Sequence, residues 1–127
     1  TDKAKKYILF LPEGELHELS LLFADYLIKS RNNKSIYLGQ SLPYMDLEAV
    51  HEIHQPDYLL AVLTTVPGPA ESQAYIDRLS KNFPNTKILL TGYQVIGQDI
   101  RVPDNVTIFD RLEQLITFVE ENKFSLA

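Results

Sequence analysis

The chain has no cysteine among its 127 residues, and it has no long apolar run. Without cysteine, disulfides, thiolate metal sites and cysteine nucleophiles are excluded together. No stretch approaches the roughly 18 consecutive apolar residues that a membrane-spanning helix needs. Positive charge is also scarce, because 12 Lys and Arg stand against 17 Asp and Glu, and the net charge is −5. Nucleic-acid-binding modules usually carry a basic surface, so we expect this chain not to bind DNA by itself.

The length and the start of the chain indicate its organisation. A chain of this length with 45% apolar residues is typical of one domain with one core, and no repeat or domain boundary interrupts residues 1–127. The first residues, TDKAKK, are polar, and no signal-like segment follows them. We therefore expect a single cytoplasmic domain without a membrane partner, excised from a longer protein.

Five near-continuous apolar runs are spaced along the chain. They are KYILFL (6–11), KSIYLG (34–39), DYLLAVLTT (57–65), TKILLTG (86–92) and NVTIFD (105–110). Runs without in-and-out alternation are typical of strands that are buried on both faces, as in parallel sheets. The sequence therefore predicts five parallel strands.

Helical patterns lie between these runs, since apolar residues recur there at spacings of three and four. The four sets are Leu16, Leu19, Phe23, Tyr26 and Leu27; Leu47, Val50 and Ile53; Tyr75, Ile76 and Leu79; and Leu112, Leu115, Ile116 and Val119. Residues 93–105 have only a weak helical pattern and are expected to form an irregular loop. The alternation predicts an α/β fold with a doubly wound, five-stranded parallel sheet of flavodoxin-like (Rossmann-like) order and right-handed crossovers.

In such a sheet a ligand binds beyond the carboxyl ends of the strands, where the strand order reverses. This rule selects three loops, at residues 12–17, 64–69 and 92–98. Glycine is scarce, with five in the chain, and neither Gly-x-Gly-x-x-Gly nor Gly-Lys-Ser/Thr is present. Dinucleotide sites and Walker-type nucleotide sites are therefore excluded.

The first loop and its helix start read PEGELHEL (12–19), with three glutamates and one histidine. Together with YLGQSLP (37–43), this stretch resembles the cobalamin (vitamin B12)-binding domains, in particular the C-terminal sensor domain of MerR-type transcription regulators. The first loop of that family reads Asp-x-His-x-x-Gly, its third strand ends Ser-x-Leu and its fourth ends Gly-Gly. Here the three places read Glu15-x-His17-x-x-Ser20, Ala61-x-Leu63 and Thr91-Gly92. The resemblance extends over essentially the whole chain.

This resemblance implies a cobalamin site. In the family the histidine coordinates cobalt from below, and the acid two residues earlier holds the other ring nitrogen, which fixes the tautomer of a metal-bound imidazole. His17 is then the cobalt ligand and Glu15 its acceptor, provided that both lie in the loop or the first helical turn. The cofactor-binding positions that the match implies are Glu15, His17, Ser20, Ala61, Leu63, Thr65, Thr91 and Gly92.

Three positions depart from the family pattern. In the family the displaced nucleotide tail of the cofactor threads between the sheet and the first helix, past glycines and a serine. Here Ser20 replaces a glycine, Ala61 replaces the serine and removes a donor worth roughly 1 kcal/mol, and Thr91 adds bulk. We therefore expect cobalamin binding to be weakened or lost while the fold is kept.

Other charged and titratable residues receive simpler interpretations. His51 and His54 lie three apart on one face of the second helical pattern, but the nearby carboxylates belong to an ordinary solvated face, and we expect no metal there. Glu13 and Glu18 are interpreted as first-turn residues that favour the positive end of a helix.

Three functions remain open. The first is a cobalamin-sensing regulatory domain of a MerR-type regulator, and the second is a cofactor-free dimerisation or effector module of such a regulator. The third is a carrier domain of a cobalamin-dependent mutase or methyltransferase, which the three departures disfavour. In each case we expect no catalytic residues and no enzyme activity of the chain itself. We also expect a homo-oligomer that contacts DNA only through a separate winged-helix domain preceding Thr1.

Overall fold

The computed structural model describes residues 4–68 and 70–122. Residues 1–3 and 123–127, and Pro69 at the end of the predicted loop 64–69, lie outside the described part. Five strands form one sheet: β1 (Lys6–Pro12), β2 (Lys34–Leu42), β3 (Tyr58–Val62), β4 (Lys87–Thr91) and β5 (Val106–Ile108). Neighbouring strands pair in parallel in the order β2-β1-β3-β4-β5. The predicted five-stranded parallel sheet is confirmed.

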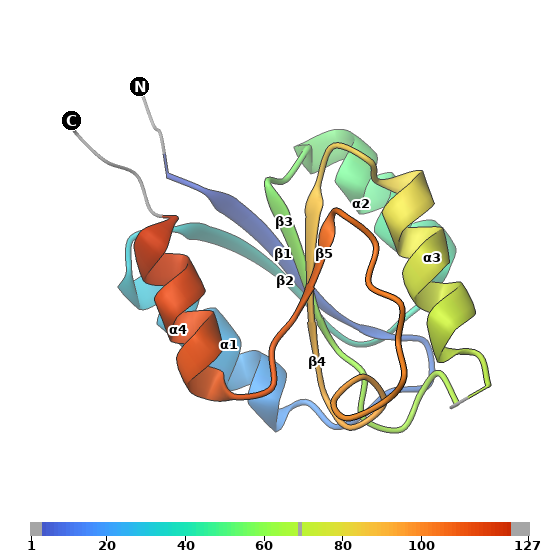
Figure 1. Cartoon of the computed structure of the whole chain (residues 1–127). Coiled ribbons are helices and arrows are strands. Elements are labelled where there is room, and N and C mark those ends of the chain that lie inside the picture. The colour runs from blue at the N-terminus through green and yellow to red at the C-terminus, as the bar shows by residue number, and fades with distance from the viewer. Residues whose placement is uncertain (1–3, 69, 123–127) are drawn as a thin grey trace.

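Four helices cover the sheet: α1 (Leu19–Ser30), α2 (Tyr44–His54), α3 (Ser72–Asn82) and α4 (Leu112–Glu121). Figure 1 shows α1 and α4 together on one face and α2 and α3 on the other. Residues 93–105 form turns and no helix, as predicted. None of the described helices combines the length and the apolar character that crossing a membrane requires.

Side chains of successive strand residues point alternately into two cores, because the two faces of a strand repeat every second residue. Leu60 of β3 packs on the α1–α4 face with Leu21 and Leu115. Its neighbour Leu59 packs on the α2–α3 face with Leu47 and Ile76. Burial on both faces explains why the strands read as continuous apolar runs.

The strand order places a ligand-binding crevice at one edge of the sheet. β1 lies between β2 and β3, so the chain runs from β1 to β2 on one side of β1 and then to β3 on the other side. At such a reversal the loops that follow the two central strands diverge and leave a crevice between them. Here these are the loops after β1 and after β3, which include residues 13–18 and 63–68.

Candidate functional site

The loop between β1 and α1 is held by backbone hydrogen bonds. The N–H of Glu15 donates to the carbonyl oxygen of Pro12 (2.9 Å), which closes a turn whose Gly14 has a left-handed φ of 93°. The N–H of Gly14 donates to Oγ of Ser41 (3.1 Å), and the N–H of Ser41 donates to the carbonyl oxygen of Glu15 (3.1 Å). The loop is therefore fastened to the end of β2 before the helix begins.

The carboxylate of Glu15 is fully buried and joins the two loops of the crevice. Its Oε1 accepts hydrogen bonds from the backbone N–H groups of Thr64 (2.9 Å), Thr65 (2.6 Å) and Val66 (3.1 Å), and from Oγ1 of Thr65 (3.3 Å). Its Oε2 accepts from the backbone N–H of His17 (3.2 Å) and lies 2.7 Å from Nδ1 of the same residue. One side chain thus fixes both the loop after β3 and the imidazole ring.

These hydrogen bonds determine the charge of Glu15. Burial by itself raises the pKa of a carboxyl group, because it penalises the charged form. The donors at Thr65, at the His17 ring, at Val66 and at the His17 backbone outweigh that effect and lower the pKa of Glu15 from 4.5 to about 2. Glu15 is therefore a carboxylate at neutral pH.

The imidazole of His17 is oriented by Glu15 and open to solvent, with 64% of its side chain exposed. Because a carboxylate has no proton to donate, the hydrogen between the two groups resides on Nδ1. In the neutral ring Nε2 then keeps its lone pair, and the part of the chain that the structure describes offers it no hydrogen-bond partner. A neutral imidazole held in this way presents Nε2 as a metal ligand.

The predicted geometry of this pair is confirmed, since both residues precede the first residue of α1. The anchoring of residues 64–66 by Glu15 was not predicted. Its signal in the sequence is weak, because backbone N–H groups carry no residue-type pattern and these lie about fifty positions away along the chain.

A small pocket lies between the sheet and the helices α1 and α4, in the place where the resemblance puts the nucleotide tail. Its volume is about 120 Å³, and its lining comprises Ser20, Ala24, Leu60, Val62, Thr91, Phe109, Arg111, Leu112 and Leu115. Ser20 and Thr91, both expected at the tail, line this pocket. Oγ1 of Thr91 donates a hydrogen bond to the carbonyl oxygen of Phe109 (2.7 Å), which holds this side chain at the pocket wall.

Ala61 and Leu63 do not line this pocket. Their side chains belong to the α2–α3 face of the sheet, whereas Leu60 and Val62 face α1 and α4. Because side chains alternate along a strand, an assignment that is displaced by one residue puts each side chain on the wrong face. The prediction that Ala61 lies beneath the first helix was therefore wrong, and the larger Leu60 lies there.

Thr65 and Gly92 have structural roles that the motif comparison did not describe. Thr65 binds Glu15 through its N–H and its hydroxyl group. Gly92 has a φ of 113°, and a Cβ added to it would lie 2.6 Å from the carbonyl oxygen of Leu63. Glycine is thus required at position 92 by the close approach of the loops after β3 and β4.

No family model and no curated protein matches the chain. Solved structures do match it. A cobalamin-binding protein from Desulfitobacterium hafniense DCB-2 matches 93% of the chain with a TM-score of 0.62 and 13% identity. The methanol:cobalamin methyltransferase complex MtaBC from Methanosarcina barkeri matches 95% with a TM-score of 0.73 and 14% identity. The monomethylamine corrinoid protein of the same organism matches 91% with a TM-score of 0.67 and 16% identity.

The chain has the fold of these cobalamin- and corrinoid-binding proteins. At 13–16% identity the likeness is one of fold. The chain spans about half the length of the solved chains that it matches, with 51%, 47% and 57% of them covered.

Of the described residues, the His17–Glu15 pair fits a cobalamin site, and the pocket between the sheet and α1 does not. His17 and Glu15 have the donor set that an axial imidazole ligand needs, with one nitrogen held and the other exposed. The pocket beside Leu60 and Thr91, at about 120 Å³, is too small for a buried nucleotide tail. Such a tail has roughly 20 heavy atoms, and pockets for ligands of that size hold about 300 Å³ or more. The site can thus present a ligand nitrogen, but its pocket as it stands is smaller than the tail of intact cobalamin.

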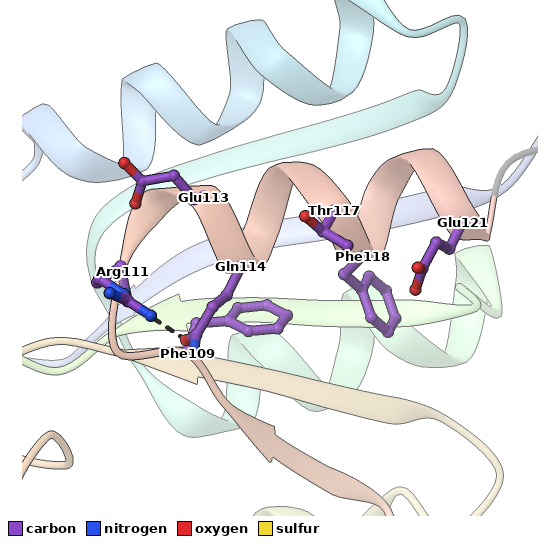
Figure 2. A pocket seen from close by; sticks show the side chains of 7 residues that line it. All are labelled: Phe109, Arg111, Glu113, Gln114, Thr117, Phe118 and Glu121. Carbon is purple, nitrogen blue, oxygen red and sulfur yellow. Dashed lines mark hydrogen bonds between the residues drawn. The ribbon is translucent and has the colours of Figure 1, made fainter.

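A larger hollow of about 450 Å³ runs along α4 and is shown in Figure 2. The rings of Phe109 and Phe118, with centroids 5.7 Å apart, lie among charged and polar side chains there. It contains none of the predicted site residues, and its mixed lining points to no particular ligand.

His51 and Glu18 each have a hydrogen-bond partner within the fold. Nε2 of His51 lies 2.7 Å from Oγ1 of Thr86, and burial lowers the pKa of this histidine. Within residues 4–68 and 70–122 no group of three His, Asp or Glu is arranged to hold a metal ion. Glu18 stands at the N-cap of α1, where its Oε2 accepts a hydrogen bond from the hydroxyl of Tyr37 (2.6 Å). The first turn of α1 contains no acid, so the first-turn interpretation of Glu13 and Glu18 was wrong.

Proposed function

We propose that the chain is a regulatory domain of a MerR-type transcription regulator, built on the fold of cobalamin-binding proteins, and that it binds intact cobalamin weakly or not at all. The domain senses a ligand through the loop that carries Glu15 and His17, or acts as a cofactor-free effector module. The observation that carries the proposal is the contrast between an oriented, exposed imidazole and a nearly closed pocket.

A carrier domain of a cobalamin enzyme is the second candidate. Two of the similar structures support it, since they are by name a methyltransferase complex and a corrinoid protein. A carrier must retain its cofactor through many turnovers, and a pocket of about 120 Å³ lined by Leu60 and Thr91 argues against this. We therefore favour regulation, with no catalytic residue in the chain itself.

The proposal assigns DNA contact to another part of the protein. The net charge of −5 argues against phosphate binding by this domain. A separate winged-helix domain, N-terminal to it in a cytoplasmic regulator, would supply that contact.

Titration with hydroxocobalamin, followed by absorption and calorimetry, tests the proposal. We expect the unmodified chain to bind with a dissociation constant above about 10 µM. The double change Leu60→Ala and Thr91→Gly should tighten binding at least about tenfold, because extra volume in a packed slot costs about 1–3 kcal/mol. Adding His17→Ala to that variant should abolish the spectral change from benzimidazole to imidazole ligation.

Ala61→Ser is the matched control, since its side chain faces α2 and α3 and should give no gain in affinity. Circular dichroism confirms that each variant is folded. Submicromolar binding by the unmodified chain would refute weakened binding and favour the carrier role. Equal affinities for the opened variant and the Ala61→Ser control would refute the role of the pocket.

A further inference from the structure

Helix α1 is apolar on two opposite sides. Its inward side buries Leu21, Ala24, Leu27 and Ile28 against the sheet and α4. The opposite side, here called the outer face of α1, consists of Leu19, Leu22, Phe23 and Tyr26 with the preceding Leu16, and these side chains are exposed by between 45% and 82%. A helix on a protein surface ordinarily has a polar outer side, and one that is apolar all round is buried in its working state.

The outer face of α1 is continuous and large. The rings of Phe23 and Tyr26 stack with centroids 6.4 Å apart and planes 16° apart. With about 200 Å² of accessible surface for each large side chain, the exposed fractions amount to roughly 600 Å² per copy. The other exposed large apolar side chains among the described residues, Met45, Ile53, Tyr93, Val102 and Leu112, lie on other segments, and scattered residues of this kind are normal on protein surfaces.

We propose that the outer face of α1 joins two copies of this chain, whose α1 helices pack antiparallel about a two-fold axis near Leu22 and Phe23. A pair of such faces buries roughly 1,200 Å², which is the lower end of the range for specific interfaces. This interface does not depend on cobalamin or on any other ligand, so it stands apart from the function proposed above.

The arrangement of residues along α1 favours the antiparallel pair. With the axis near Leu22 and Phe23, Leu19 of each copy lies opposite Tyr26 of the other. Glu18 and Lys29 are eleven residues apart, about three helical turns, and so share one flank. An antiparallel pair brings this flank of the two copies together, with each Glu18 near Lys29 of the second copy, whereas in a parallel pair the two flanks lie on opposite sides of the interface and the charges do not meet. The two helix dipoles also oppose each other in the antiparallel pair.

Contacts within the chain hold these charges on that flank. Nζ of Lys29 lies 3.1 Å from Oδ2 of Asp25, and the carboxylate of Glu18 is held by the Tyr37 hydroxyl. Both side chains thus also have a partner within their own copy before association.

Sedimentation of the chain at about 1–500 µM measures the association, and we expect a dimer. Leu19→Asp and Tyr26→Asp each put a charge into the apolar contact and should weaken it at least about 100-fold. Both side chains are well exposed, at 82% and 64%, so both variants should remain folded by circular dichroism. Met45→Asp is the control, because it changes an exposed apolar side chain on α2 and should leave the dimer intact.

Single cysteines determine the direction of the pair, because the chain has no cysteine of its own. In the antiparallel dimer, Leu19→Cys and Tyr26→Cys should each form few disulfides alone and should cross-link when mixed. A monomer at every concentration overturns the proposal and assigns the face to another part of a longer protein or to a different partner. A dimer that survives both aspartate variants, or Leu19→Cys cross-linking to itself, also overturns it.

Discussion

Replacing Glu15 by glutamine should destabilise the fold by about 3 kcal/mol at neutral pH. The buried carboxylate accepts hydrogen bonds from the N–H groups of Thr64, Thr65 and Val66 and from the backbone and ring of His17. A glutamine has almost the same shape, but its NH₂ group must face some of these donors and leave them unpaired. Each unpaired buried donor costs about 1–3 kcal/mol.

The lowered pKa of Glu15 gives the same magnitude and a pH dependence. A fall from 4.5 to about 2 is equivalent to about 3 kcal/mol, since one pKa unit is about 1.4 kcal/mol. Because the pKa is lower in the folded state, the stabilisation is complete above pH 4.5 and is lost as the pH falls towards 2. Between pH 7 and pH 3 the wild type should lose about 2 kcal/mol from this group alone.

Urea denaturation followed by circular dichroism at pH 7, 5, 4 and 3 measures this effect. Glu15→Gln should be less stable at pH 7, and the difference from the wild type should shrink as the pH falls. Glu13→Gln is the matched control, because it removes a carboxylate from an exposed side chain of the same loop. A constant difference between Glu15→Gln and the wild type from pH 7 to pH 3 would refute this account of the buried carboxylate.

Two further substitutions test the packing around the site. Gly92→Ala should destabilise the fold by about 2 kcal/mol or more, because its Cβ would overlap the carbonyl oxygen of Leu63 as well as strain a left-handed φ. Gly97→Ala, with a φ of 73° and open space around it, should cost only about 1 kcal/mol in the same urea assay, and equal losses would contradict the overlap. The buried hydroxyl of Tyr7 has no hydrogen-bond partner among the described residues. Tyr7→Phe should therefore preserve or raise the melting temperature, and a loss above about 1 kcal/mol would reveal a partner for that hydroxyl.

The fold could be predicted because the strands are buried on both sides. Each of the five apolar runs overlaps one observed strand, and the ends differ by up to a few residues. β5 is shorter than the predicted run, since regular pairing ends at Ile108 although Phe109 remains buried under α4. Helix α1 begins three residues after Leu16, because Glu15 and His17 are held in the loop by their mutual hydrogen bonds.

The candidate site could be predicted only in its local part. Glu15 and His17 are two residues apart, so their spacing was enough to predict a contact once a loop was expected. The partners of Glu15 at residues 64–66 bind through backbone N–H groups, and their identity depends on how the two loops meet in space. A sequence pattern contains no information about this contact between two loops.

The sequence does not predict which side chains of β3 face α1, and the reason is the same one that makes the strand itself easy to predict. LLAVL has apolar residues on both faces, so it lacks the alternation that shows which side chains face α1. Pairing with β1 and β4 determines this, and it turns Leu60 and Val62 towards the pocket. An alanine facing the pocket would have removed one hydrogen-bond donor and left the pocket open, whereas the leucine at position 60 fills part of the pocket. The expected weakening of cobalamin binding therefore rests on the volume of Leu60, together with Thr91, and not on the missing hydroxyl at Ala61.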